Sequence, residues 1–189
     1  RATRQATSRP TATRIGAEVD GRLVDLTTAA ALTLHEQGEP DWEEYARYLV
    51  PPDMVTYLER GEKSRRIVQG SLALVKAALD AGGSTRTAPD RWWRAPSTPA
   101  GSLGPDGGRL TYGFDEVHLL APVPRPNIVW DSMVFHEHVK MGREVIPDVF
   151  FEWPPYFAQS GAIVAGPFDP IVKPRFTEQL DFELEFGVY

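Results

Sequence analysis

The pattern of the sequence changes near residue 113, and this change most constrains what the chain can fold into. Up to residue 83 the chain carries mainly helix-type patterns, whereas beyond the change it carries short strand-like runs separated by Pro-rich turns. Between them, residues 84–113 are rich in Pro, Gly, Ser and Thr, as in a linker or a long surface loop. We therefore expect an α/β (α+β) fold, with a small mixed region and its loop over residues 1–113 and an incomplete β-rich domain over residues 114–189.

The first region predicts one hairpin and four helices. Residues 12–26 alternate apolar and polar side chains around an Asp-Gly dipeptide, which is typical of tight hairpin turns. Thr27 and Thr28 can cap an Ala- and Leu-rich helix that ends near Gly38. Three more helices are predicted over residues 42–50, 53–61 and 62–83. The expected apolar face of the last helix consists of Ile67, Leu74, Val75 and Leu79.

The second region predicts four strands and one helix. The strand-like runs are residues 114–124, 127–131, 162–172 and 180–189, and the helical pattern covers residues 131–142. The chain begins at Arg1 without Met and ends inside the last strand-like run. We therefore expect it to be part of a longer protein.

Composition narrows the class of protein. The 189 residues are 42% hydrophobic and 24% charged, which is typical of a globular chain. The net charge of −6 argues against a general nucleic-acid binder. No apolar run approaches the roughly 18 residues that a membrane helix needs. The absence of cysteine leaves no disulfide or thiolate metal site and fits a reducing compartment, so we expect a cytoplasmic protein.

Two short segments carry clusters of a different kind. Residues 1–10 hold three Arg and no acid, and we expect a flexible or edge segment there. The Arg-Trp-Trp-Arg cluster at residues 91–94 could stack on a ligand through cation–π contacts. Anchoring of the loop to its own domain is the favoured alternative, because buried aromatic surface contributes the larger free energy.

The last strand-like run places three acidic side chains on one face. Asp181, Glu183 and Glu185 alternate with apolar residues, which we expect to pack into a core on the other face. An amphipathic strand with a hydrated acidic face gives the same pattern. Like charges on one face repel each other, however, and a bound cation removes that cost. Oxygen ligands of this kind favour Mg²⁺, or Ca²⁺ or Mn²⁺, over Zn²⁺.

The segment 127–142 supplies candidate partners for such a site. Asp131 follows an apolar run and opens a predicted helix, where Asp is also a good N-cap. His136 and His138 flank Glu137, and residues two apart on a helix point in different directions. At most one of the two histidines therefore faces a given site, where it can act as a general base near neutral pH.

Several of these segments together resemble the fumarylacetoacetate hydrolase superfamily. RIGAEVDGRLVDL resembles the opening hairpin of many members, and LLAPVPRPNIVWDSMVFHEHVK resembles the entry into their catalytic domain. SGAIVAGPFDPIVKP followed by LDFELEFGV resembles the run that ends in the D-[FY]-E-x-E-[LF] metal-binding strand. The resemblance implies that the second region is the start of a mixed β-sandwich or β-roll catalytic domain, truncated at its C-terminus.

The resemblance also implies roles for individual residues. Glu183 and Glu185 match the two glutamate ligands of the metal, and Asp131 matches an upstream aspartate ligand. His138 matches the histidine that activates water in the fumarylacetoacetase branch. The matches to substrate-binding residues are Tyr156 and Arg143.

The implied function is metal-dependent hydrolysis of a C–C bond in a dioxo acid of the fumarylacetoacetate or acylpyruvate type, by a homodimer that binds neither nucleic acid nor membrane. The chain has PPYFAQSG where fumarylacetoacetase has a GYHGR stretch, and it has Met141 where acylpyruvases have a glutamate, so the substrate stays open. The alternatives are a 2-oxo acid hydratase or dehydratase, a decarboxylase or an isomerase of the same superfamily. A non-catalytic binding fragment is the alternative from another class.

Overall fold

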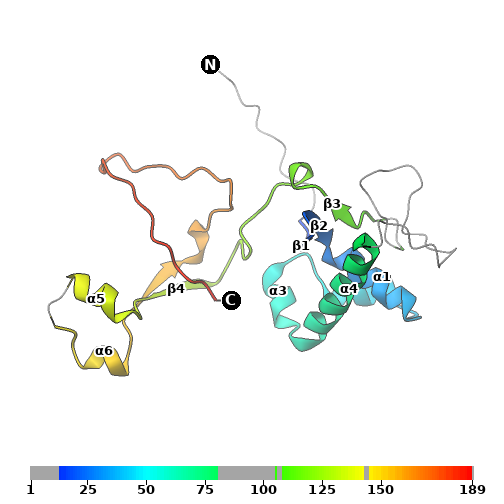
Figure 1. Cartoon of the computed structure of the whole chain (residues 1–189), viewed down its shortest axis with the longest axis horizontal. Helices are drawn as coiled ribbons and strands as arrows, with labels where there is room; N and C mark the ends of the chain where they lie inside the picture. The colour runs from blue at the N-terminus through cyan, green and yellow to red at the C-terminus, as the bar shows by residue number, and fades with distance from the viewer. Residues whose placement is uncertain (1–12, 81–104, 106–107, 143–144, 189) are drawn as a thin grey trace, which may run out of the picture. The chain divides into compact units, whose positions relative to one another are not determined.

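The computed structural model describes residues 13–80, 105, 108–142 and 145–188. The chain divides into two compact units, of which the first ends at His118 and the second begins at Leu119 (Figure 1). The fold is mixed α/β with two small antiparallel sheets. The β-sandwich or β-roll of the second region and the domain boundary at residue 113 stay predictions.

A hairpin opens the first unit. Strand β1 (Gly16–Val19) pairs antiparallel with β2 (Arg22–Asp25), and β3 (Thr111–Tyr112) pairs with the other edge of β2. The turn residues Asp20 and Gly21 have φ angles of 49° and 75°, in the left-handed region that the favoured two-residue hairpin turns use. The predicted hairpin is therefore confirmed.

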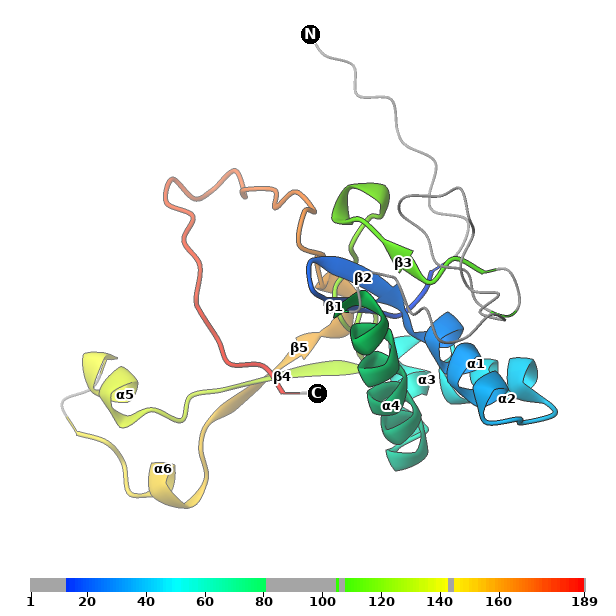
Figure 2. The same ribbon diagram turned by 45° about the vertical axis from the view of Figure 1, so that its right-hand side comes forward.

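Among the described residues of the first unit, four helices lie together on one side of its sheet (Figures 1 and 2). They are α1 (Leu26–Glu36), α2 (Trp42–Leu49), α3 (Met54–Glu59) and α4 (Glu62–Asp80). The four helices predicted from the sequence are confirmed. In the part of the chain that the structure describes, no helix is both long and apolar enough to span a membrane.

Helix α1 forms the centre of the core in this unit. Its residues from Leu26 to Leu34 are all buried, as expected for a helix that is covered on every side. Ala30 and Leu34 belong to one apolar cluster, which includes Leu49 of α2. The second apolar cluster contains Val24, Ala29, Leu32, Val75, Ala78 and Leu110. The helix thus links the sheet to the other helices.

The carboxylate of Asp25 joins the hairpin to helix α1. Asp25 Oδ1 accepts a hydrogen bond from the backbone N–H of Thr28 at 3.0 Å, so Asp25 is the N-cap of the helix. Its two oxygens also accept hydrogen bonds of 2.7 and 3.0 Å from the guanidinium of Arg14. The prediction that Thr27 or Thr28 caps this helix is wrong, because the helix already begins at Leu26.

Helices α1 and α4 pack through small side chains. The buried residues of α4 are Ser64, Val68, Ser71, Val75 and Ala78. Of the predicted apolar face only Val75 is among them, while Ile67, Leu74 and Leu79 are partly buried at its sides. The prediction was wrong in this respect because the buried stripe of α4 runs through Ser71, which contacts Thr33 of α1.

Two serines of this interface have different surroundings. Ser71 Oγ donates to the carbonyl of Ile67 at 2.7 Å and lies 2.8 Å from Thr33 Oγ1. Ser64 Oγ is buried and has no hydrogen-bond partner among the described residues. An unpaired buried hydroxyl lowers stability, whereas a paired one does not.

The described residues of the second unit form a two-stranded ribbon and two short helices. Strand β4 (Ile128–Ser132) pairs antiparallel with β5 (Tyr156–Ser160). Between them lie α5 (His136–Gly142) and α6 (Val149–Glu152), which are found beyond one end of the ribbon in Figures 1 and 2. The 3₁₀ helix η2 (Gly161–Ile163) follows β5.

Three of the four predicted strands are wrong. The run 127–131 is confirmed as β4, but residues 114–124 contain only the 3₁₀ helix η1 (Phe114–Glu116). Residues 164–172 and 180–188 contain neither helix nor strand. A strand needs a neighbour to satisfy its backbone N–H and C=O groups, and no described strand pairs with these runs.

We expect Asp25→Ala to lower the free energy of unfolding by about 2–3 kcal/mol, because it removes the helix cap and a charged hydrogen bond together. Asp25→Asn keeps an oxygen for the cap and removes the charge, so it should cost about half as much. Urea unfolding followed by circular dichroism measures both variants. An equal loss in the two variants would show that the cap contributes nothing.

The two serines of α4 provide a second test. Ser64→Ala should raise the free energy of unfolding by about 1 kcal/mol, because it removes an unpaired buried hydroxyl. Ser71→Ala should lower it by about 1 kcal/mol, because it leaves Thr33 with one partner fewer. Both variants remove the same atom from the same helix, so each is the control for the other in urea unfolding. A change of the same sign in both would contradict the assigned environments.

Candidate functional site

Asp131 lies in strand β4, where its Cα pairs with that of Phe157 in β5. The prediction that it caps a helix from residue 131 is wrong, because the backbone stays extended through β4 and α5 begins only at His136. Side chains alternate between the two faces of a ribbon, so the register places Asp131 on the same face as Val129 and Gln159. We call this the Asp131 face.

Gln159 contacts the Asp131 carboxylate directly. Gln159 Nε2 donates a hydrogen bond of 3.0 Å to Asp131 Oδ2. The two residues are diagonal neighbours across the strand pair, a separation that a long side chain can bridge. Asp131 is half-buried, and its Oδ1 atom accepts no hydrogen bond from the described residues. One oxygen of the carboxylate is therefore held and the other is open.

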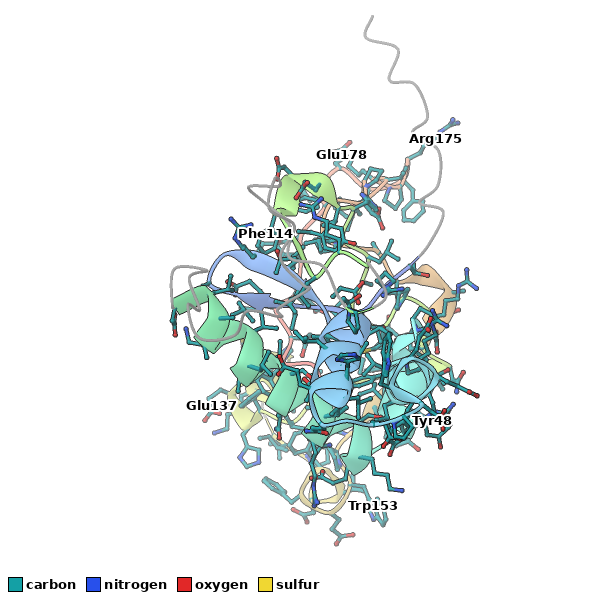
Figure 3. The ribbon with its side chains drawn as sticks, turned by 90° about the vertical axis from the view of Figure 1, so that its right-hand side faces the viewer. Tyr48, Phe114, Glu137, Trp153, Arg175 and Glu178 are labelled. Carbon is teal, nitrogen blue, oxygen red and sulfur yellow. The ribbon has the colours of Figure 1, made fainter. Side chains whose placement is uncertain are left out.

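The opposite face of the ribbon carries Trp130 and Tyr156, whereas Phe157 lies on the Asp131 face. Trp130 and Tyr156 make an edge-to-face contact with ring centroids 5.1 Å apart, and both are more than half exposed. Ser132 lies on this face too and donates through its hydroxyl to the carbonyl of Pro155 at 3.2 Å. Tyr156, a predicted substrate contact, thus lies on the face opposite to Asp131. Other aromatic residues of the unit are also exposed, among them Trp153, which directly follows α6 and is labelled in Figure 3.

The two histidines of α5 have different surroundings. The ring of His136 lies edge-on to Phe150 and Phe151, at centroid distances of 5.7 and 5.0 Å. Both histidines are exposed, and the imidazole of His138 makes no aromatic contact or hydrogen bond with the described residues. Positions two apart on a helix point in different directions, so the packing of His136 leaves His138 directed elsewhere.

Glu183 and Glu185 are exposed and lie outside any strand. Their neighbours Phe182 and Leu184 are 82% and 91% exposed, so the prediction that the apolar face of this run packs into a core is wrong for the described structure. The C-terminal segment, coloured red, passes strand β4 in both Figure 1 and Figure 2.

The predicted metal ligands are not gathered into one site. Within residues 13–80, 105, 108–142 and 145–188, no group of three or more His, Asp or Glu side chains is placed to hold a metal ion. The chemistry of the donors does fit, because three carboxylates suit a hard divalent cation. Their positions in this structure do not fit, because residues 180–188, which carry Glu183 and Glu185, are not paired with strand β4, which carries Asp131. Arg143 and residues 1–10 and 91–94 lie outside the described residues.

Sequence reasoning missed strand β5 and the contact of Gln159 with Asp131. The run Tyr156–Ser160 has the sequence YFAQS, which lacks the apolar–polar alternation of a half-buried strand, and all five residues are exposed. It also follows two prolines, which are typical of turns and loops. The close approach of Gly161 to the Pro126 carbonyl, which a Cβ would prevent, indicates where β5 returns beside the start of β4.

Comparison with known proteins finds relatives of low identity. The chain is 25% identical over 140 residues to oxaloacetate tautomerase FAHD2A, mitochondrial, and to oxaloacetate tautomerase FAHD2B, mitochondrial, both from Bos taurus. Each match covers 74% of this chain and 33% of the relative. A match to oxaloacetate tautomerase FAHD2A, mitochondrial, from Homo sapiens is 32% identical over 74 residues, which is 39% of this chain and 22% of the relative. No protein-family model and no solved structure matches.

The chain thus spans about a third of the length of the curated relatives from Bos taurus. These relatives are enzymes of the fumarylacetoacetate hydrolase superfamily, so the comparison supports the resemblance at the level of the superfamily. Their names specify tautomerases, and C–C hydrolysis is not among the activities named.

The different surroundings of the two histidines can be tested by their effect on stability. His136→Ala should lower the free energy of unfolding by about 0.5–1.5 kcal/mol, because it removes the edge-on aromatic contacts. This loss is in addition to the effect of exposing the apolar surface that the ring covers. His138→Ala should change it by less than about 0.5 kcal/mol, because its ring makes no aromatic contact with the described residues. Urea unfolding of both variants measures the difference. The reverse order would mean that α5 presents its other side to α6.

Proposed function

We propose that this chain supplies the cation-holding and proton-transferring residues of an enzyme that acts on a small 2-oxo or dioxo acid. The observation that carries the proposal is the Asp131 face of the ribbon, which presents a half-buried carboxylate with one open oxygen. The similarity to oxaloacetate tautomerases supports the class of substrate.

The acidic run and the ribbon have complementary patterns. The ribbon has an aromatic face with Trp130 and the Asp131 face, and residues 180–188 alternate apolar and acidic side chains. If these residues pair with an open edge of the ribbon and their apolar side chains join the aromatic face, Glu183 and Glu185 fall on the Asp131 face. Such pairing would also support a two-stranded ribbon, which is marginally stable by itself. We propose this three-stranded arrangement as the cation-binding state.

In that state Asp131, Glu183 and Glu185 would hold a divalent cation, with Mg²⁺ as the first candidate and Mn²⁺ or Ca²⁺ as alternatives. When bound, the cation would polarise a carbonyl group of the substrate and offset developing negative charge. Arg143 is proposed to bind the carboxylate of the substrate, since a guanidinium forms paired hydrogen bonds with it. Tyr156 is proposed as a further substrate contact.

His138 is proposed to move the proton, because an exposed imidazole can accept and return one near neutral pH. In tautomerisation it would take the proton from the carbon next to the carbonyl, and a proton would be delivered to the carbonyl oxygen. In C–C hydrolysis it would take a proton from water, whose oxygen adds to the carbonyl carbon. The C–C bond then breaks, and its electron pair stays on the leaving carbon, which is protonated.

Tautomerisation is favoured by the names of the relatives, and C–C hydrolysis is the reaction that the sequence resemblance implies. Both reactions use the same carboxylates and the same histidine, so the residue assignments do not depend on the choice. A homodimer and a cytoplasmic location belong to the same proposal, although the names of the relatives specify mitochondrial proteins.

Glu183→Gln should weaken the binding of Mn²⁺ by about 10-fold or more, because a charged oxygen ligand becomes a neutral amide. Titration of the protein with Mn²⁺, followed by electron paramagnetic resonance of the free ion, measures the affinity. Glu178→Gln is the matched control, because Glu178 is an exposed glutamate of the same segment outside the alternating run (Figure 3). Equal affinity in Glu183→Gln and the unmodified protein would contradict the proposed cation site.

Activity distinguishes the two reactions. Ultraviolet absorbance of the enol form follows tautomerisation of oxaloacetate, and loss of an acylpyruvate follows C–C cleavage. His138→Ala should abolish whichever activity is found and leave Mn²⁺ affinity within about twofold, since the ring is no proposed ligand. If His138→Ala retained turnover, the proton would have to be moved by His136 or by a group that is not a histidine.

A further inference from the structure

We propose that the Asp20-Gly21 turn is a site of isoaspartate formation, and that the ion pair between Asp20 and Lys76 of α4 slows this reaction in the folded chain. The inference is independent of the proposed function, because it concerns the hairpin of the first unit. It rests on two contacts of the turn, one at the Asp20 carboxylate and one at the Gly21 nitrogen. These are the two groups that the reaction joins.

Asp-Gly dipeptides rearrange spontaneously because glycine has no side chain that obstructs ring closure. The backbone nitrogen of Gly21 attacks Cγ of Asp20, and a C–N bond forms. One carboxylate oxygen leaves as water, with one proton from the nitrogen and one from the solvent. Water then adds to either carbonyl of the resulting succinimide ring. Opening on one side restores Asp20, whereas opening on the other side leaves isoaspartate, and the reaction needs no reactant besides water.

Lys76 holds the Asp20 carboxylate away from the main chain. Its Nζ atom donates hydrogen bonds of 3.2 and 2.9 Å to the two oxygens of Asp20, and a longer one of 3.5 Å to Asp80 of its own helix. The hydrogen bond to Asp20 and the charge of that carboxylate raise the pKa of Lys76, so its ammonium group stays charged. To reach the Gly21 nitrogen, Cγ has to rotate about the Cα–Cβ bond of Asp20. Both hydrogen bonds to Lys76 break in that rotation, so the ion pair opposes ring closure.

The backbone of the turn is also held, while the site stays open to water. The N–H of Gly21 donates to Glu18 Oε1 at 2.8 Å, and both turn residues have left-handed φ angles. Asp20 and Gly21 are exposed, and a Cβ added at Gly21 would meet nothing within 4 Å. Water therefore reaches the turn, and the restraint comes from the contacts rather than from burial.

Isoaspartate would change the hairpin itself, because its main chain runs through the side chain and is longer. The favoured two-residue turns match the twist of the flanking strands only with their left-handed angles. The pair Val19↔Arg22 lies next to the turn, and β2 ends at Asp25, the N-cap of α1. Lys76 would thus protect an element on which the first unit depends.

The sequence supplies an internal reference for the measurement. Its other Asp-Gly dipeptide, Asp106-Gly107, lies outside the described residues. Cleavage by trypsin after arginine releases the two dipeptides in separate peptides, residues 15–22 and residues 95–109. The isoaspartate and aspartate forms of a peptide have the same mass, and they are separated by reversed-phase chromatography and identified by electron-transfer fragmentation. The ratio of isoaspartate in the two peptides, after incubation of the whole chain in warm neutral buffer, is the readout.

The test compares Lys76→Met, Lys76→Arg and Lys63→Met with the unmodified chain. None of these changes lies in either peptide, and circular dichroism confirms that each variant is folded. Lys76→Met removes the charge, and Lys76→Arg keeps a cation that pairs with a carboxylate. Lys63→Met is the matched control, because Lys63 is an exposed lysine near the other end of α4. We expect Lys76→Met to raise isoaspartate at Asp20 by about 2–5-fold relative to Asp106, the factor to which an exposed ion pair corresponds. The other two variants should leave the ratio unchanged.

Incubation in urea concentrated enough to unfold the chain separates the contact from other effects of the lysine. There the unmodified chain and Lys76→Met should form isoaspartate at Asp20 equally fast, because the contact with α4 is lost in both. A difference that persists in urea would show that the folded contact is not the cause, and the inference would be wrong. It would also be wrong if Lys76→Met left the ratio unchanged in buffer, or if Lys63→Met raised it as much.

Discussion

The first unit depends on the buried carboxylate of Asp25. Its oxygens bind Arg14 and cap α1, and its backbone N–H donates to the carbonyl of Leu110 at 2.9 Å, beside β3. One residue therefore ties together the entry to the hairpin, the edge strand and the central helix. The apolar clusters on the two sides of α1 form around this point, because Val24 and Leu26 are its neighbours in the chain. Burying a carboxylate is unfavourable unless its hydrogen bonds are made, and here they are.

Asp131 is the same residue type in a different physical state. In Asp25 both oxygens are engaged, by an arginine and by a helix N-terminus. In Asp131 a neutral amide holds one oxygen, and no cation among the described residues pairs with the other. The charge of Asp25 therefore stabilises the fold, whereas the charge of Asp131 is available to a ligand. Asp131 is therefore the carboxylate of the two that is open to a ligand.

The second unit also differs in how its apolar residues are placed. Only a few of its side chains, such as Val139 and Phe150, are buried, while Trp130, Phe182 and Leu184 are largely exposed. Burial of apolar surface is the main favourable term in folding, so side chains of this kind normally have a partner surface. Residues 180–188 alternate apolar and acidic side chains, and the ribbon has open edges. The proposed pairing of this run with the ribbon would give both of them a partner surface.

Local sequence determined the elements whose signals are complete within a few residues. The Asp20-Gly21 turn forces a left-handed backbone, and the helices α1 to α4 begin and end near capping and glycine residues, so these could be predicted. The acidic alternation of residues 180–189 and the resemblance that it supports were likewise visible in the sequence. Tertiary structure alone decided which runs become strands, because a strand needs a partner for its backbone hydrogen bonds. The strand that carries Asp131 pairs with β5. It also decided which residues of α4 are buried, that His136 packs against phenylalanine, and that Gln159 contacts Asp131. Each of these contacts joins residues from two different elements, and no local sequence pattern determines which elements come together.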